Sequence, residues 1–206
     1  MFRLGGDFRE PESSVRANRL TEVWESQWPG DEPVGHLLRC DHQGRSTRFH
    51  SLAHSKRYAT SADETAEILR RDYAILADLL VLSSSTAIHV IGQEWDADDL
   101  VGGRIKRYMP GAWPWRIFTD PDAHIPGEPT HSFYFWVLPI HTVEALDELL
   151  QWVAEDRVRF IVADAEMTWI FAPYDGGCDV FLPNAETRDE LEAKHPDWLP
   201  NDAKRR

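Results

Sequence analysis

The chain has 206 residues, of which 42% are hydrophobic and 11% aromatic, a composition typical of a folded globular protein rather than a disordered segment. Its formal net charge of −13 argues against broad binding to nucleic acid or anionic membranes, because both need a dominant basic surface. The two cysteines, Cys40 and Cys178, lie far apart and in no CxxC pair. This spacing excludes a disulfide framework or a zinc knuckle and suits a reducing cytosol.

The beginning of the chain, Met1 to Asp7, contains no apolar signal core, and no stretch approaches ~18 consecutive apolar residues. We therefore expect a soluble cytoplasmic protein. One domain is the natural expectation at this length. Residues 1–206 are accordingly predicted to form a single globular domain with frayed ends, at about 1–12 and 200–206.

The N-terminal part of the chain predicts one helix and two strands. The helix is capped by Ser13 or Ser14, and its apolar residues fall on one face. Strands are then predicted over 34–38 and 47–52, because a turn signal at 42–44 separates two strand-like runs. These two strands would form a hairpin.

The middle of the chain begins with a second predicted helix. Ser61 and Glu64 form a capping box, and the apolar residues that follow recur at helical spacing. Next come a predicted strand over 87–92, a weakly periodic loop with one helical turn over 96–114, and a second strand over 115–119. A turn-rich segment over 120–129 then leads to a third strand over 133–138.

The last third of the chain predicts two more helices and three strands. Thr142 caps the third helix, and Asn184 caps the last one. The segment Asp175-Gly176-Gly177 is a hairpin signal, because glycine supplies the positive φ that such turns need. The three strands are predicted over 159–163, 168–174 and 178–182.

Adjacent strand pairs broken by about four helices indicate an α+β fold, with a largely antiparallel sheet that is covered on one side. The strands do not alternate one-for-one with helices, which argues against a doubly wound parallel sheet. Most of the nine tryptophans are expected in the core. The alternative is that Trp113, Trp115 and Trp136 form an aromatic groove for an extended peptide.

Residues 39–58, the basic segment, are the most informative stretch of the sequence. Five Lys or Arg stand against one Asp, so this segment carries +4 and the rest of the chain carries −17. Such an asymmetry marks a place where an anionic group or partner can be held. The alternative is that these cations pair with acidic residues elsewhere in the chain. The candidate binding residues are Arg45, Arg48, His50, His54, Lys56 and Arg57.

Other candidate chemistry rests on weaker patterns. His50 and His54 have i, i+4 spacing but no third ligand, so neither a metal site nor a cofactor is predicted. Asp175 and Asp179 flank the hairpin turn, where turn geometry explains carboxylates better than acid–base catalysis does. Cys178 lies in a predicted strand and is expected to be buried and inert rather than nucleophilic. Hydrolase, kinase and strand-linked GxGxxG motifs are absent from the sequence.

Two stretches of the chain resemble an uncharacterised bacterial family, the domain-of-unknown-function family 3885. One runs from Thr168 to Leu182, where a Tyr-Asp pair and a Gly-x-Asp-Val sequence form a hairpin that precedes a helix and a terminal Trp198-Leu199. The other is Arg48 to Leu52 with the helix at 63–81. Residues 95–136 have no counterpart in this resemblance. The resemblance implies a soluble bacterial protein, and it carries no activity or functional residue.

Two classes of function remain open. The leading hypothesis is a non-catalytic protein-interaction module, because an acidic surface with a basic segment gives electrostatic complementarity to a basic or acidic-patch partner. An immunity-type protein that caps a basic toxin is one concrete version. The alternative is an enzyme or small-ligand binder that holds an anionic group with residues 45–57, using His50 as general base and Asp175 as its partner. Convergence of Arg48, His50 and Asp175 in one concave site would favour this alternative.

Overall fold

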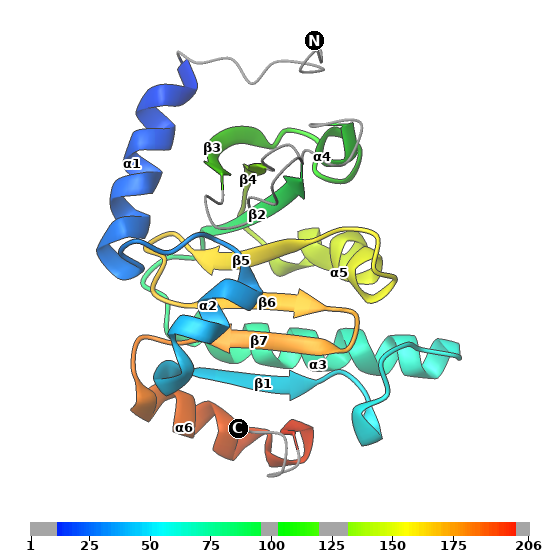
Figure 1. The fold of residues 1–206 in the computed structure, drawn as a ribbon. Coiled ribbons are helices and arrows are strands. Elements are labelled where there is room, and N and C mark those ends of the chain that lie inside the picture. The colour runs from blue at the N-terminus through cyan, green and yellow to red at the C-terminus, as the bar shows by residue number, and fades with distance from the viewer. Residues whose placement is uncertain (1–11, 96–102, 120–131, 201–206) are drawn as a thin grey trace, which may run out of the picture.

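The structure is a computed structural model that describes residues 12–95, 103–119 and 132–200. Its strands are β1 (Ser46–His50), β2 (Ile88–Trp95), β3 (Trp113–Thr119), β4 (Ser132–Ile140), β5 (Phe160–Asp164), β6 (Ile170–Tyr174) and β7 (Gly177–Phe181). They form one seven-stranded sheet in the order β1-β7-β6-β5-β2-β4-β3, and every neighbouring pair is antiparallel (Figure 1). The predicted α+β class with a largely antiparallel sheet is confirmed.

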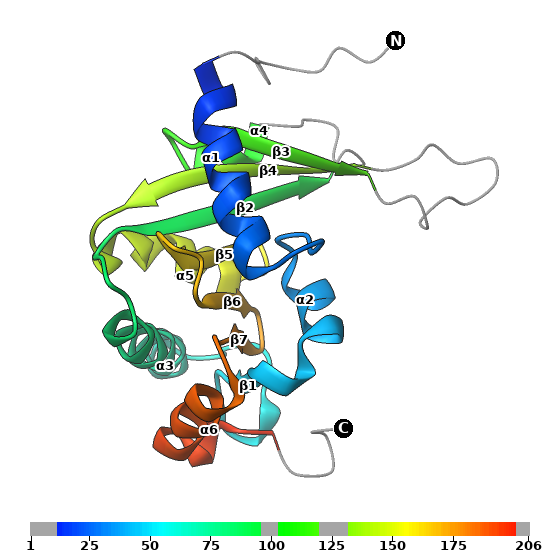
Figure 2. The ribbon, with the colours of Figure 1, turned by 90° about the vertical axis from the view of Figure 1, so that its left-hand side faces the viewer.

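Helices cover both faces of this sheet. Within the described ranges they are α1 (Glu12–Gln27), α2 (Gly35–Asp41), α3 (Ala62–Val81), α4 (Gly103–Tyr108), α5 (Asp147–Ala154) and α6 (Ala185–Lys194). One face packs against α1 and α2, and the opposite face packs against α3, α4, α5 and α6 (Figure 2). The described part therefore contains six α-helices rather than about four, and the expectation of a sheet covered on one side is wrong.

Apolar residues on both faces of the central strands explain this double cover. In β5, Phe160 and Val162 contact the core under α3 and α5, whereas Ile161 and Ala163 contact the core under α1 and α2. A strand that is apolar on both faces needs a layer of helices on each side. None of the described helices is long and apolar enough to cross a membrane.

The strand predicted over 34–38 is wrong, and so is the hairpin predicted from it. The segment forms α2, and β1 pairs instead with β7. Val34 and Leu38 are fully buried against the α1 side of the sheet, while His36 between them is exposed. A strand would place all three side chains on one face, whereas a helix brings together residues four apart and turns the middle one away.

The predicted C-terminal hairpin is present as β6 and β7, but its glycines act differently from the prediction. Gly176 and Gly177 do not have positive φ values. Gly177 pairs with His50 of β1, and a Cβ atom at this position would collide with the backbone oxygen of Phe49. Glycine is therefore required here for the close approach of two strands rather than for the turn conformation.

Two of the four predicted side-chain caps are confirmed. The cap predicted at Ser13 or Ser14 is wrong, because both residues lie within α1. Ser61 Oγ accepts a hydrogen bond from the Glu64 N–H over 3.2 Å, and Asn184 Oδ1 accepts one from the Thr187 N–H over 2.9 Å. The Thr142 side chain makes no capping hydrogen bond, and a short 3₁₀ turn precedes α5.

Three further expectations lie outside the described residues. The first is the pair of frayed ends, of which only Glu12 and Pro200 are described. The second is the turn-rich segment 120–129. The third is the first part, residues 96–102, of the loop predicted over 96–114. The rest of that loop contains α4, which is the predicted helical turn, and the first residues of β3.

Candidate functional site

A groove crosses one end of the sheet face beside the N-terminus of α2. Two cavities of about 240 and 250 Å³ form it, and both are lined by Gln93, Asp156, Val158 and Arg159. We call these two joined cavities the sheet-face groove. Its walls come from α2, from strands on both sides of β5 and from the loop between α5 and β5, so distant parts of the sequence build one site (Figure 1).

A buried carboxylate fixes Arg48 on one side of the groove. The Nε and Nη2 atoms of Arg48 donate to the two oxygens of Asp179 over 2.7 and 2.8 Å, and its guanidinium lies 5.0 Å from the ring centroid of Tyr174. Burial lowers the pKa of Arg48, but the hydrogen bonds and the charge of Asp179 outweigh burial and raise that pKa above its ordinary value. Arg48 is therefore a charged donor whose orientation is set before any ligand binds.

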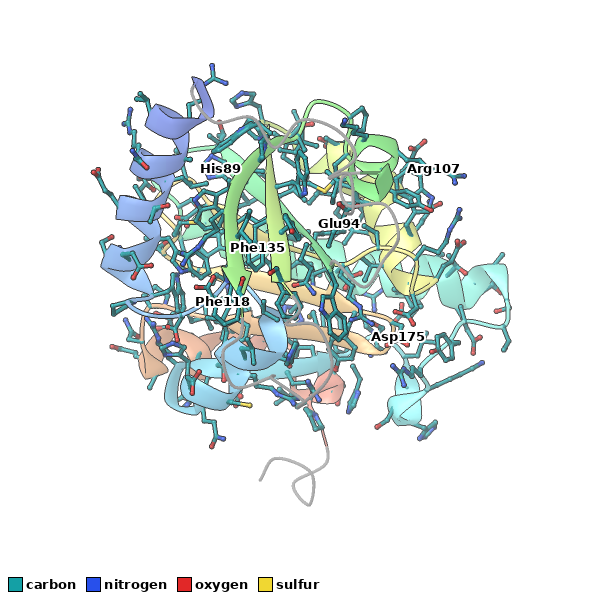
Figure 3. All side chains as sticks on the ribbon, turned by 45° about the horizontal axis from the view of Figure 1, so that its top comes forward. His89, Glu94, Arg107, Phe118, Phe135 and Asp175 are labelled. Carbon is teal, nitrogen blue, oxygen red and sulfur yellow. The ribbon has the colours of Figure 1, made fainter. Side chains whose placement is uncertain are left out.

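Arg57 is held in a similar way. Its Nε donates to Asp175 Oδ2 over 2.5 Å, and only 3% of the Asp175 side chain is exposed although Arg57 itself lies mostly in solvent. Figure 3 shows Asp175 at the end of the sheet, in the turn that joins β6 to β7. A hydrogen bond to Asp175 raises the pKa of the Tyr58 hydroxyl, so two side chains from the basic segment converge on this one carboxylate.

Between these ion pairs the groove offers one exposed cation and two neutral polar groups. Arg159 is exposed and forms no ion pair with any other described residue. His36 is exposed, but partial burial of its side chain, followed by the charges of Arg159 and Arg39, lowers its pKa and favours the neutral ring at pH 7. Burial raises the pKa of Tyr174, whose hydroxyl therefore stays protonated and able to donate.

Three stacked aromatic rings lie at the other end of the groove. Trp95, Phe133 and Phe118 are direct cross-strand neighbours on β2, β4 and β3. Successive ring centroids are 5.6 and 6.3 Å apart, with interplanar angles of 15° and 19°. Trp95 and Phe133 line the 250 Å³ cavity, and Trp95 is 43% exposed; Figure 3 marks Phe118 on β3. We call this row the aromatic ladder.

Of the six residues predicted to bind an anion, two line the sheet-face groove, namely Arg48 and Arg57. His50 lies on the same face of β1 as Arg48 but is not part of the lining, and its Nε2 is 3.2 Å from Ser55 Oγ. The convergence that would favour an enzyme is therefore incomplete. Arg48 and Asp175 line one cavity, and the proposed general base stands outside it.

The other three predicted binding residues lie away from the groove. The Arg45 guanidinium stacks over Trp28, 3.8 Å from the ring centroid. Lys56 Nζ pairs with Glu64 Oε1 over 2.5 Å. His54 is exposed and has a φ of +60°. Contacts within the chain thus engage Arg45 and Lys56, and the basic segment does not form one continuous patch.

The remaining candidates do not assemble a catalytic centre. Asp175 and Asp179 each bind a different arginine. Cys178 is buried, and burial, together with the nearby Asp72, raises the pKa of its thiol, which disfavours the reactive thiolate. Within residues 12–95, 103–119 and 132–200, no group of three His, Cys, Asp or Glu could hold a metal ion.

Two of the tryptophans considered for a peptide groove are core residues instead. Trp115 and Trp136 are buried, one against each face of the sheet. The exposed indole is that of Trp95, which the sequence did not single out. The other lining residues missed by sequence reasoning are His36, Gln93, Asp156 and Arg159. A polar residue such as Gln93 inside an apolar strand was the available signal, but only the strand order shows which of these residues meet.

A family model described as "Domain of unknown function (DUF3885)" matches residues 34–203. The matched range includes residues 95–136, the part that the resemblance drawn from sequence left without a counterpart. No curated protein and no solved structure matches the chain.

Proposed function

The chain belongs to a family of domains of unknown function, DUF3885, and from its geometry we propose that it is a non-catalytic module that binds an anionic group in the sheet-face groove. One observation carries this proposal. Arg48 and Arg57 are each anchored by a buried carboxylate, and both line a cavity with Arg159, which forms no ion pair with the other described residues.

Anchored guanidinium groups suit phosphate or carboxylate oxygens, because a fork of fixed N–H donors matches their geometry. Asp179 and Asp175 pair with Arg48 and Arg57. Asp156 also lines the cavity and balances the overall charge, so Arg159 contributes as a cation that forms no ion pair with the other described residues. The Tyr174 hydroxyl adds a neutral donor in the same cavity. A ligand with one small anionic group fits this donor set better than a polyanion does.

A binding role is favoured over catalysis because the predicted general base and the candidate nucleophile both lie outside the groove lining. His50, the candidate general base, is not part of the groove lining, and the thiol of Cys178 is buried. A general base has to come within hydrogen-bond reach of the proton that it abstracts.

The proposal is tested by thermal unfolding in phosphate and in chloride at matched ionic strength. A ligand that binds the folded chain raises the unfolding midpoint as its concentration increases. We expect phosphate to raise this midpoint for the wild type and for Arg107→Ala, an exposed arginine outside the groove. Arg159→Ala should lose at least half of the rise. General stabilisation by phosphate acts on all three chains alike, so an equal rise in Arg159→Ala would reject the proposal.

A second candidate function is a protein-interaction module with a basic partner, of which an immunity-type protein is the concrete version. It is favoured by a run of exposed acidic side chains along the 3₁₀ turn and helix α5, at Glu144, Asp147, Glu148 and Glu155. Such a surface steers a positively charged partner toward it.

Charge reversal tests this second candidate. The double variant Glu144→Lys/Glu148→Lys should abolish capture of a basic partner in a pull-down. The control Glu22→Lys changes an exposed acid on α1, on the opposite side of the sheet, and should retain it. Equal recovery of the partner by both variants would count against this function.

A further inference from the structure

Two charged side chains of the sheet-face groove have no partner of their own. Three arginines and three aspartates line its 240 Å³ cavity, so their charges balance. Two of each form the anchored ion pairs, which leaves Asp156 and Arg159. Both are exposed, and within the described part of the chain their side chains form no hydrogen bond or ion pair, not even with each other.

Asp156 lies in the turn that follows α5, but the turn does not need its carboxylate. Asp156 has a φ of +55°, and the N–H of the next residue, Arg157, donates to the Trp152 oxygen over 2.8 Å. Glycine is the usual residue at such a position after a helix. An aspartate here therefore serves neither the turn nor an ion pair with another described residue, and its charge is free to bind a ligand.

The two unpaired charges act on different walls of the cavity. Partial burial lowers the pKa of His36 on α2, and the charge of Arg159 lowers it further. On the other wall, the hydrogen bond to Asp175 raises the pKa of Arg57, and the charge of Asp156 is a smaller cause of the same increase. The cavity therefore has an unpaired cation toward α2 and an unpaired carboxylate toward the turn between β6 and β7.

A small zwitterion matches this arrangement better than a simple anion does. Its carboxylate can accept hydrogen bonds from the guanidinium of Arg159, and its ammonium group can donate to the carboxylate of Asp156. A simple anion would leave Asp156 unpaired and close to a like charge. The cavity of about 240 Å³ lies below the range of about 300–1,000 Å³ that is typical of drug-sized ligands, which favours a small molecule.

We propose that the sheet-face groove binds a small zwitterion of the amino-acid class. The carboxylate of the ligand contacts Arg159, and its ammonium group contacts Asp156. The amide of Gln93, which lines the same cavity, offers a donor and an acceptor to other polar atoms of the ligand. This inference rests on the proposed function, since the carboxylate is the anionic group assigned there, and it adds the ammonium group. A free amino acid and a short peptide share this chemistry.

Isothermal titration calorimetry of the whole chain tests this proposal. The probes are the standard L-amino acids, the dipeptides glycylglycine and alanylalanine, and inorganic phosphate. The zwitterion that binds most tightly is then compared with its N-acetyl derivative, which loses the ammonium charge, and with its carboxamide, which loses the carboxylate. We expect the zwitterion to bind about tenfold or more tightly than either derivative, a ratio in the range of one hydrogen bond to a charged group. Whether an amino acid or a dipeptide binds most tightly identifies the source of the ligand.

Variants then separate the ammonium contact from the carboxylate contact. Asp156→Asn removes the charge but keeps a residue type that tolerates a positive φ. It should weaken binding of the zwitterion about tenfold, while the N-acetyl derivative and phosphate bind at least as tightly as they do to the wild type. Arg159→Ala should weaken binding of all three ligands.

Glu155→Gln is the matched control. Glu155 is an exposed acid next to Asp156, but it pairs with Arg157 and is not part of the groove lining. This variant should leave the affinity for all three ligands unchanged. Thermal unfolding of each variant checks that the fold is retained.

Three outcomes would overturn the zwitterion assignment. They are an N-acetyl derivative that binds as tightly as its parent, a carboxamide that does so, and an unchanged preference for the zwitterion in Asp156→Asn. If phosphate or the N-acetyl derivative binds through Arg159 but no zwitterion binds better, the zwitterion assignment fails and the proposed function stands. If none of the probes binds, both fail.

Discussion

At the scale of single residues, buried carboxylates decide where the arginines of the basic segment point. Asp179 and Asp175 are 6% and 3% exposed at their side chains, and each binds an arginine that reaches toward solvent. A carboxylate buried this deeply needs a partner, whereas the half-exposed pair of Lys56 with Glu64 contributes little to stability. The two anchored arginines therefore serve both the fold and the groove.

Removing the Arg48 side chain should be costly, because it leaves the Asp179 carboxylate buried and unpaired. We predict that Arg48→Ala lowers the free energy of unfolding by about 3 kcal/mol. The double variant Arg48→Ala/Asp179→Ala should recover part of this loss, since both charges are then gone. Urea denaturation measures both effects.

Arg70→Ala is the matched control, because Arg70 pairs with the more exposed Glu67. Its loss should stay below about 1 kcal/mol. If Arg48→Ala and Arg70→Ala cost the same, the Arg48–Asp179 pair is not an anchor.

Asp72 is another buried carboxylate, and it lies outside the groove lining. It sits on the buried side of α3 near Cys178, and burial raises its pKa to about 8. The ordinary pKa of an aspartate is about 3.9. At pH values between these two, Asp72 is ionised in the unfolded chain but keeps its proton in the folded chain. The free energy of unfolding therefore declines as pH rises toward 8 and levels off above it.

We predict that Asp72→Asn removes the larger part of this pH dependence and leaves the part that comes from Glu32, whose pKa burial raises to about 7. Its unfolding free energy should match that of the wild type near pH 4 and exceed it by a few kcal/mol at pH 7, on the order of the shift in pKa. Denaturation series at several pH values measure this difference. Asp63→Asn, an exposed position on the same helix, should not alter the pH profile. A wild type whose stability is constant between pH 5 and 8 would contradict the prediction.

At the scale of elements, the position of α2 depends on one glycine at its start. A Cβ atom on Gly35 would lie 2.9 Å from the Cβ of Ala172 on β6, closer than two carbon atoms normally approach. Gly35 and Ala172 also line the sheet-face groove with His36. The close packing of α2 on β6 therefore sets one wall of the site.

Gly35→Ala should push α2 away from β6. We predict a loss of about 1–3 kcal/mol in unfolding free energy from overpacking, together with weaker binding of phosphate. The compensating variant Gly35→Ala/Ala172→Gly should restore both. Gly44→Ala, where a Cβ meets nothing within 4 Å, should leave both unchanged. Failure of Ala172→Gly to restore stability would show that the contact with Ala172 does not position α2.

Prediction from sequence succeeds for elements whose signals are local. Ser61 and Asn184 cap their helices as expected, because a side-chain oxygen next to free N–H groups acts within one turn. The segment 34–38 fits a strand pattern although it is helical, because five residues are too few to separate a period of 2 from a period of 3.6. The role of Gly177 cannot be predicted locally, because the strand that approaches it, β1, lies far away in the sequence.

At the scale of the whole molecule, strand order creates the site. The order β1-β7-β6-β5-β2-β4-β3 places Arg48, from an edge strand, and Trp95, from a strand near the other edge, at two ends of one groove. Alternation along a strand predicts which face a residue occupies, but not which strand lies beside it. The sequence could therefore nominate Arg48 and Arg57 by charge, while Arg159 and Trp95 became candidates only through the topology.

The most direct measurement of the central claim, that the sheet-face groove holds an anionic group, is a phosphate titration followed by backbone amide NMR. We predict that saturable shifts concentrate at Gln93, Arg159 and Tyr174, which line the groove, and that Arg159→Ala reduces them while Arg107→Ala does not. Saturable shifts centred on other surfaces, or no saturable shifts in the groove at all, would contradict the claim.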